Sequence, residues 1–197
     1  RAGRLTANPG CYPACSLLPL VPLLRAQAID AEDVLIDAKS GVSGAGRAPK
    51  EGTLYCEVAG GFHAYGVNSH RHGPEIDQEL SVAAGQPVTC HFTPHLVPMP
   101  RGMMASLYLR PTDGRDAEAL HALLAARYAD EPFVHVLPFG ETPATRHVAG
   151  SNHCLIGVSR DRTGRRAVVQ SVIDNLVKGA AGQAVQNMKC ERKFPNL

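Results

Sequence analysis

The sequence predicts an α+β fold with a largely antiparallel sheet. Its strand-like and helix-like segments mix without the regular βαβ alternation that builds a parallel sheet. The 197 residues are 44% hydrophobic and 19% charged, which is typical of a globular chain with a sizeable core. A net charge of +2 from scattered charged residues gives no basic patch for a nucleic acid. The chain has neither a secretory signal nor an apolar run near the ~20 residues that span a bilayer, so we expect no membrane partner and a cytoplasmic location.

The first half of the chain is predicted to contain one long helix followed by short extended segments. The Leu-rich stretch 11–28 is typical of a helix, and Pro13 is well placed in its first turn. Pro19 and Pro22 are expected to kink this helix or to end it early. The segments that follow are a short strand (33–39), a glycine loop (40–47), a strand (53–58) and an extended stretch (63–72).

The second half alternates helices with β-rich segments. A helix is predicted at 74–84, where Pro74 takes the first position and acidic residues follow in the first turn. A clearer amphipathic helix is predicted at 116–130, and a helix of small residues at 178–188. The β-rich segments of this half are 87–97, 103–111, 132–138, 153–161 and 165–174.

The densest motif, ANPGCYPAC (7–15), places Cys11 after a tight turn, at the predicted start of a helix. A thiol there feels the positive end of the helix dipole, which favours the nucleophilic thiolate. Gly10 permits close approach of the backbone, whose N–H groups can hold an oxyanion. The alternative is a buried cysteine in a helix cap, and the spacing alone leaves both interpretations open. The six cysteines are spread singly, so neither a disulfide framework nor a CxxC zinc site is expected.

Two histidines two positions apart, His70 and His72, lie in the run SHRHGPEIDQEL. In an extended segment they would face the same side. His72 also precedes the predicted helix start, a position that disfavours the imidazolium, whereas Glu75 favours it. The alternatives are a solvated polar loop or a metal pair completed by His91 and His95. Those two lie four apart on a proline-interrupted strand, and we expect no metal site.

Two further segments have the composition of anion-binding loops. The glycines and serines of SGVSGAGR (40–47) expose backbone N–H groups that suit a phosphate or a dinucleotide. This run is not GxGxxG and lacks the Lys-Ser/Thr ending of a P-loop, so a plain flexible loop is the alternative. In PMPRGM (98–103), a proline-restrained Arg101 can clamp an anion, although surface arginines are common.

Taken together and in this order, these motifs resemble the N-acetyl-gamma-glutamyl-phosphate reductase family of arginine biosynthesis. The resemblance runs from about Asn8 to Met188 and rests on NPGCYP, SGVSGAGR, FHAYGV, HRHGPEI, HLVPMPRGM and DNLVKGAAGQAVQNM. It implies a glyceraldehyde-3-phosphate-dehydrogenase-like C-terminal catalytic domain with a mainly antiparallel mixed sheet. It also implies a homo-oligomer that uses NADPH to reduce N-acetyl-gamma-glutamyl phosphate to the semialdehyde.

The resemblance further implies roles for individual residues. Cys11 is expected to be the nucleophile that forms a thioester, and His72, in preference to His70, to be the acid/base. The residues expected to contact the substrate are Asn8, Glu57, Arg71 and Arg101. The residues expected to contact NADP are Ser43, Gly44, Ala45, Gly46 and Asn175.

Two departures from the family pattern lead to an expectation about domains. No strand–GxGxxG–helix precedes Asn8, and the ending KCERKFPNL (189–197) does not match the usual one. We therefore expect residues 1–174 to form a catalytic and dimerisation domain. Residues 175–197 are expected to form a helix and tail that pack on a dinucleotide-binding domain outside this sequence.

Three other functions fit some of these features. An aspartate-semialdehyde dehydrogenase uses the same Cys/His chemistry on a shorter acyl phosphate, but the HRHGPEI run argues against it. A Cys/His hydrolase or acyltransferase without nucleotide would use Cys11 and His72 but leave the glycine loop unexplained. A non-catalytic binding or assembly fragment is the third alternative.

Overall fold

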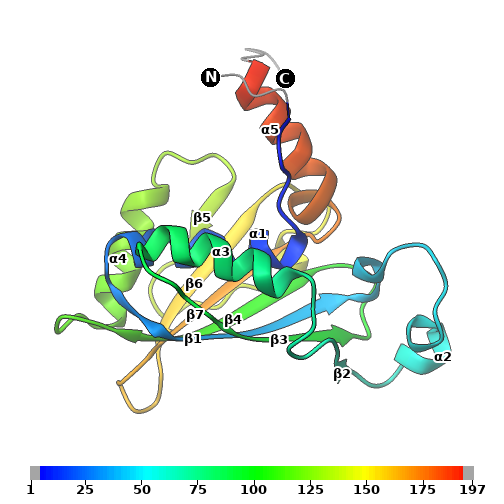
Figure 1. The fold of residues 1–197 in the computed structure, drawn as a ribbon, viewed down its shortest axis with the longest axis horizontal. Helices are drawn as coiled ribbons and strands as arrows, with labels where there is room; N and C mark the ends of the chain where they lie inside the picture. The colour runs from blue at the N-terminus through cyan, green and yellow to red at the C-terminus, as the bar shows by residue number, and fades with distance from the viewer. Residues whose placement is uncertain (1–4, 193–197) are drawn as a thin grey trace.

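A seven-stranded mixed sheet forms the base of the molecule (Figure 1). The computed structural model describes residues 5–192. The strand order is β2-β3-β1-β4-β7-β6-β5; β1–β3 and β5–β6 pair in parallel, and the other four pairings are antiparallel. This confirms the predicted α+β fold with a mainly antiparallel sheet. The strands are β1 (Ile29–Gly41), β2 (His63–Ala64), β3 (His91–Val97), β4 (Met103–Pro111), β5 (Val134–Val136), β6 (Cys154–Arg160) and β7 (Ala167–Ile173).

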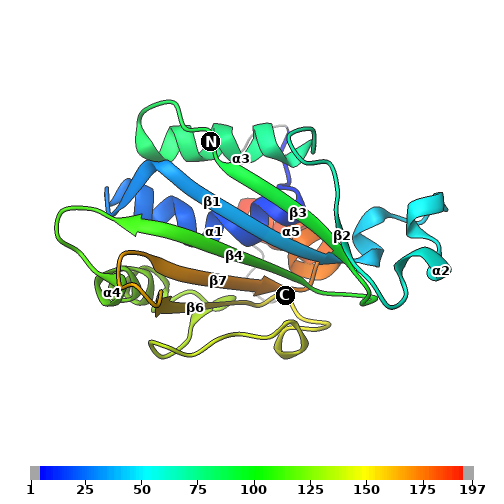
Figure 2. The same cartoon turned by 90° about the horizontal axis from the view of Figure 1, so that it is seen from below.

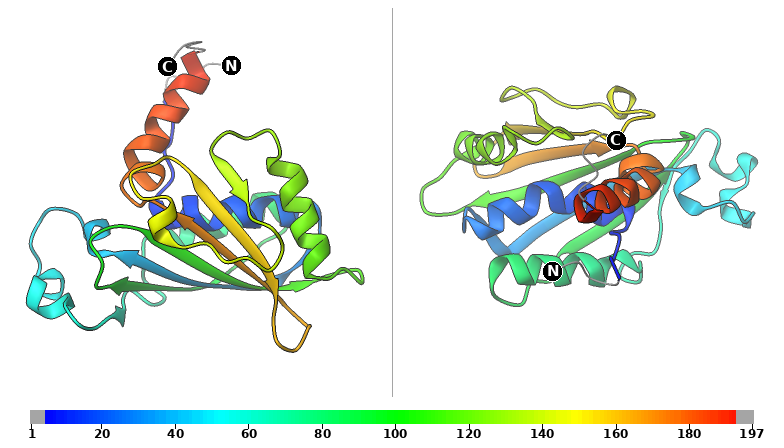
Figure 3. Two further views of the ribbon diagram at one scale, coloured as in Figure 1. Left: turned by 180° about the vertical axis from the view of Figure 1, so that it is seen from behind. Right: turned by 90° about the horizontal axis from the view of Figure 1, so that it is seen from above.

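Three helices cover one face of the sheet, with α1 lying between α3 and α4 (Figure 3). Among the described residues no helix covers the opposite face, which Figure 2 shows from below. The helices are α1 (Cys11–Arg25), α2 (Tyr55–Val58), α3 (His72–Ala84), α4 (Ala117–Tyr128) and α5 (Gly182–Arg192). Shorter helical turns are η1 (Val42–Ala45), η2 (Glu51–Thr53), η3 (Thr145–His147) and η4, a turn of π-helix (Val177–Ala181).

The core lies between the sheet and its three covering helices. Alternate residues of each strand point to this side because strand side chains have a period of two. On β1 the buried set includes Val34, Ile36 and Ala38, and α1 contributes Leu20 and Leu23. Each such fully buried aliphatic side chain contributes about 1.5–3 kcal/mol relative to an exposed one. The start of α1 is thereby fixed above one end of the sheet.

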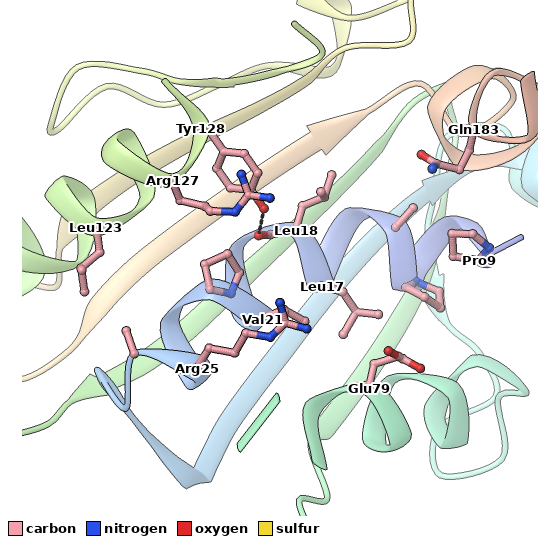
Figure 4. A pocket seen from close by; sticks show the side chains of 14 residues that line it. Pro9, Leu17, Leu18, Val21, Arg25, Glu79, Leu123, Arg127, Tyr128 and Gln183 are labelled. Atoms are coloured by element: carbon pink, nitrogen blue, oxygen red, sulfur yellow. Dashed lines mark hydrogen bonds between the residues drawn. The ribbon is translucent and has the colours of Figure 1, made fainter. Parts of the chain in front are cut away.

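Pro19 and Pro22 were expected to kink α1 or to end it early, and the helix does not end at either of them but continues to Arg25. Pro22 has no N–H to donate to the carbonyl of Leu18, one turn earlier. Tyr128 of α4 replaces that donor: its hydroxyl donates to the Leu18 carbonyl at 2.6 Å (Figure 4). Burial raises the pKa of Tyr128 to about 12, so the hydroxyl keeps the proton that it donates. Packing against the core and this substitute hydrogen bond together hold the helix.

The outward side of α1 lines a largely apolar groove of about 620 Å³ (Figure 4). Leu17, Leu18 and Val21 line it, and Arg25 and Arg127 also point toward it. The groove runs along the helix between α3 and α4, and it reaches Pro9 and Gln183 beside the start of α1.

Two sequence-based expectations for residues 53–72 are wrong. The segment 53–58, predicted as a strand, instead contains the end of η2 and all of α2. The segment 63–72 is extended only in β2, and a turn with Asn68 at φ 61° leads into α3. The stretch holding η2 and α2 extends away from the main sheet (Figure 1), so its β-forming residues have no neighbouring strand to pair with.

The N-terminal segment and α5 lie side by side and project together from the helix-covered side (Figures 1 and 3). α5 follows η4 after a kink at Ala180. Of the small-residue helix predicted at 178–188, residues 182–188 lie in α5 and the first four lie in η4. Within the described residues, no helix is long and apolar enough to cross a membrane. Residues 193–197 of the expected tail lie outside the described range.

Candidate active site

Cys11 is the first residue of α1, where three segments of the chain meet. The backbone N–H of Gly10 donates to Oε1 of Glu75, in the first turn of α3, at 2.9 Å. Gly179 of η4 packs on the other side: a Cβ on Gly179 would lie 2.8 Å from the Cβ of Cys11. The turn before α1, the start of α3 and the π-helical turn therefore enclose the cysteine.

The Cys11 thiol has a pKa above its ordinary value, because burial disfavours the thiolate. The backbone N–H groups of Tyr12 and Cys11 act in the opposite direction, as does the positive charge of Arg71. The helix start thus favours the thiolate, as the sequence predicts, but burial has the larger effect. Within this chain the pKa of Cys11 is therefore raised, whereas the helix dipole alone would lower it.

His72 lies directly against the turn that precedes Cys11. A Cβ on Gly10 would lie 2.4 Å from Nε2 of His72, so only a glycine leaves room for the imidazole there. The His72 residue is 6% exposed, and its Nδ1 has no hydrogen-bond partner among the described residues. Burial, helped by the positive potential of His70 and Arg71, lowers the pKa of His72 to about 4. The ring is therefore neutral near pH 7, with Nε2 facing the cysteine turn.

His70 lies beside His72, with the two ring centroids 4.8 Å apart. The pair is brought together by a turn at the start of α3 rather than by the extended segment that the sequence suggests. The backbone N–H of His72 donates to Nδ1 of His70 at 3.1 Å, so a neutral His70 carries its proton on Nε2. Burial, and then the charge of Arg71, lowers the pKa of His70 as well.

Two tyrosines complete the aromatic surroundings of His70. Tyr12 and Tyr65 contact its ring edge-on, with centroids 5.4 and 5.3 Å away. The Tyr65 hydroxyl donates to the Tyr12 hydroxyl at 3.1 Å, and the latter donates to the carbonyl of His95 at 3.1 Å. Burial raises the pKa of both tyrosines, so both hydroxyls are protonated at neutral pH.

The four residues expected to bind the substrate lie in different surroundings. Arg71 is exposed just before α3, and its charge acts on Cys11 and both histidines. Asn8 lies three residues before Cys11 and accepts a hydrogen bond from Asn187 of α5 at 3.0 Å. Glu57 lies on α2, which projects away from the start of α1 (Figure 1), so the structure does not bring it to the cysteine.

Arg101 pairs with a buried carboxylate. Its Nε lies 2.6 Å from Oδ2 of Asp174, whose side chain is fully buried, while the arginine side chain remains 42% exposed. Burial alone would raise the pKa of Asp174, but Arg101 and backbone N–H groups, including that of Gly150, outweigh it and hold this pKa below its ordinary range. The pair joins the β3–β4 loop to the end of β7 and leaves part of the guanidinium facing solvent.

Asn175 fixes the glycine loop to the sheet. Its Oδ1 accepts from the N–H of Gly102 at 2.7 Å, and its Nδ2 donates to the hydroxyl of Ser43 at 3.0 Å. Asn175 is 3% exposed, so its amide acts within the protein. The residues after Ser43, Gly44 to Gly46, form an exposed turn. Within residues 5–192, no group of three or more His, Cys, Asp or Glu side chains is arranged to hold a metal ion.

Sequence reasoning did not assign two contacts at this site. Glu75 was considered only for its effect on His72, whereas it binds the N–H of Gly10. Its position three residues after His72 puts both on one face of α3, which is the local signal for this role. Gly179 was seen only as part of a small-residue helix, and its contact with Cys11 has no local signal.

Comparison with known sequences decides the family. A profile of the family "Semialdehyde dehydrogenase, dimerisation domain" matches residues 11–175. The chain belongs to this family. Two solved semialdehyde dehydrogenases share its fold with a TM-score of 0.73: aspartate semialdehyde dehydrogenase II from Vibrio cholerae (20% identity, 95% of this chain and 62% of that one) and a probable aspartate-semialdehyde dehydrogenase from Pseudomonas aeruginosa (19%, 94% and 62%).

Curated relatives of this chain have a more specific name than the family. N-acetyl-gamma-glutamyl-phosphate reductase of Rhodospirillum rubrum is 60% identical over 192 residues, 98% of this chain and 54% of that protein. A probable chloroplastic N-acetyl-gamma-glutamyl-phosphate reductase of Arabidopsis thaliana is 54% identical over 195 residues, 99% of this chain and 49% of that protein. The resemblance seen in the motifs is confirmed. The chain spans about half the length of the curated relatives that it matches.

Proposed function

We propose that this chain supplies the nucleophile and the acid/base of an NADPH-dependent N-acetyl-gamma-glutamyl-phosphate reductase, which releases N-acetylglutamate 5-semialdehyde and phosphate. The observation that carries the proposal is the placement of His72 against Gly10, directly beside Cys11 at the start of α1. The 60% identity to the Rhodospirillum rubrum enzyme supports this substrate over the shorter acyl phosphate of an aspartate-semialdehyde dehydrogenase.

In the first half of the reaction, Cys11 Sγ attacks the acyl carbon of the substrate. The bond from that carbon to the phosphate oxygen breaks, phosphate leaves, and a thioester forms on Cys11. The thiol is buried and mainly protonated, so its proton must be accepted as the new bond forms. Neutral His72 accepts it through Nε2, the atom that faces the cysteine turn.

In the second half, the backbone N–H groups of Cys11 and Tyr12 stabilise negative charge at the start of α1. NADPH, when bound, supplies the hydride that reduces the thioester carbonyl. His72 returns its proton to the resulting oxyanion, which gives a thiohemiacetal. Neutral His72 then takes the hydroxyl proton as the carbon–sulfur bond breaks, the electron pair of that bond stays on sulfur, the aldehyde is released, and the proton passes back to the Cys11 thiolate. Arg71 adds a positive charge near this site and suits the phosphate group of the substrate.

The glycine loop suits the reactive end of the cofactor. Gly44, Ala45 and Gly46 are exposed, so their backbone can approach a flat ligand closely. Asn175 holds the hydroxyl of Ser43, which fixes the beginning of this turn relative to the sheet. We assign the loop to the nicotinamide end of NADP and Asn175 to its support. Specific use of NADP rather than NAD belongs to this proposal.

The domain organisation is part of the same proposal. Residues 1–174 act as the catalytic and dimerisation unit, and α5 packs on a dinucleotide-binding domain. Support for the second point comes from Val185 and Met188, apolar residues of the projecting α5 that are 47% and 43% exposed. The sheet face without helices is a surface available to a second copy in a homo-oligomer, as the family description suggests (Figure 2).

Acylation of Cys11 tests the proposed function without requiring the cofactor. The chain is mixed with N-acetyl-gamma-glutamyl phosphate, released phosphate is measured in a single turnover, and the protein is digested for mass spectrometry. We expect up to one phosphate per chain and an N-acetylglutamyl group on Cys11. Cys11→Ser should lose both signals, whereas Cys56→Ser, at an exposed thiol on α2, should keep them. Acylation of a different cysteine, or no phosphate release, would contradict the proposal.

A further inference from the structure

A chain of side-chain amides connects α5 to the segment before Cys11. Gln183 Nε2 donates to Oδ1 of Asn187 at 3.1 Å. Asn187 Nδ2 then donates to Oδ1 of Asn8 at 3.0 Å, and Asn8 Nδ2 donates to the carbonyl of Ala180 at 3.5 Å. This series of hydrogen bonds therefore starts on α5, crosses to the N-terminal segment and ends at η4.

Asn8 and Ala180, the last two residues of this path, lie in segments next to the cysteine. Asn8 precedes Cys11 by three residues, in the turn whose Gly10 packs against the imidazole ring of His72. Ala180 follows Gly179, the residue packed against Cβ of Cys11. Asn8 itself is exposed to solvent, so packing alone does little to hold its side chain, and the Asn187 amide supplies a partner with defined geometry.

We propose that Asn187 is a positioning residue for Cys11. Through Asn8 it fixes the turn 8–10, and so the direction of the Cys11 and Tyr12 N–H groups that favour the thiolate. The inference rests on the proposed role of Cys11 as nucleophile. It assigns to α5 a part in the chemistry of α1 in addition to any part in packing on another domain.

The hydrogen bond between Asn187 and Asn8 has a matched control residue on the same helix, Val185. Val185 lies two residues before Asn187, so the two side chains do not share a face of the helix. It is 47% exposed and lines a hollow with Phe133 and Asn152. Val185→Ala therefore shortens a side chain of α5 without touching the amide chain. Cys56, which is exposed on α2, provides an internal reference thiol within every sample.

The test measures alkylation of Cys11 relative to Cys56 by iodoacetamide, using peptide mass spectrometry across a range of pH. In Asn187→Ala we expect the Cys11 rate at neutral pH to fall about two- to tenfold, the effect of one lost hydrogen bond. The midpoint of its pH profile should move upward, because misaligned N–H groups stabilise the thiolate less. Val185→Ala should match the wild-type chain.

A double-mutant cycle decides whether Asn187 acts through Asn8. Asn8→Ala should reproduce the upward shift, and combining both substitutions should add nothing further. If Asn187→Ala fails to fold, Asn8→Ala still removes the hydrogen bond between Asn187 and Asn8 and so tests the same interaction. Additive effects, a downward shift of the midpoint, or a fall in melting temperature with an unchanged Cys11 profile would each overturn the inference. Failure of the acylation test with a normal alkylation cycle would instead refute only the proposed function.

Discussion

The two ends of α1 are held in different ways. At its start, single polar atoms make the contacts: the Gly10 N–H binds Glu75, and Nε2 of His72 lies against Gly10. Further along, apolar packing and one substitute hydrogen bond, from Tyr128 to Leu18, hold a stretch that contains two prolines. Substitutions at the start should therefore alter the chemistry more than the stability, and substitutions further along should do the reverse.

The largest expected effect is at the start of the helix. Cys11→Ser should lower turnover of the complete enzyme by several orders of magnitude, because a serine hydroxyl is hardly ionised there. Its melting temperature should stay close to that of the wild type. The control is Cys15→Ala, one turn further along, where a fully buried thiol donates to the carbonyl of Ser171. That variant should keep turnover and lose stability; the opposite pattern would refute the contrast between chemistry and packing.

The next largest effect is at His72. His72→Asn should lower kcat by roughly 10²–10⁴-fold with a smaller change in KM, because it removes the group that carries the proton. His70→Asn should act mainly on KM, since the Nδ1 of His70 is engaged by the His72 backbone. Steady-state kinetics with NADPH oxidation as the readout separate the two. A larger loss of kcat in His70→Asn would transfer the acid/base role to His70.

The same contrast explains what could be predicted from the sequence. Cys11 and the histidine pair were singled out from the sequence because a turn, a helix start and a two-residue spacing are local patterns. The Glu75–Gly10 hydrogen bond joins residues 65 positions apart, and only the packing of α3 beside α1 creates it. The Gly179–Cys11 contact likewise depends on where the chain returns after β7. Such contacts follow from tertiary structure, which local patterns do not encode.

The errors in the predicted fold have a similar cause. The prolines of α1 were expected to kink the helix or to end it early, but α1 continues past both of them, and a tyrosine from α4 replaces the missing donor. The segment 53–58 has the composition of a strand, yet it forms a strand only if another strand lies beside it. Strands β4, β6 and β7 were located within two residues at each end, because their buried partners agree with their local preference.

A smaller effect is expected along α1, at Tyr128. Tyr128→Phe removes the donor to the Leu18 carbonyl and should lower the free energy of unfolding by about 1–3 kcal/mol, measured by urea denaturation. The rate of Cys11 acylation should not change. In a Pro22→Ala background, the new N–H at position 22 can bind that carbonyl, so Tyr128→Phe should cost less there. An equal cost in both backgrounds would show that Tyr128 stabilises the protein by packing alone.

The smallest effect is a pH dependence of stability that originates at His72. The folded ring has a pKa of about 4, because burial and the charges of His70 and Arg71 disfavour its protonation. In the unfolded chain the pKa is about 6.5. Between these values the unfolded state binds a proton that the folded state does not, so this contribution to stability is present above about pH 6.5 and is lost as the pH falls toward 4.

Lowering the pH from about 7 to 6 should cost about 0.7 kcal/mol through this residue. Because His70 and His153 also have lowered pKa values, the relevant quantity is the difference between wild type and His72→Asn in urea unfolding at the two pH values. Identical pH dependence in both proteins would mean that His72 is not held neutral by the fold, and the proton acceptor at the start of α1 would then have to be sought elsewhere.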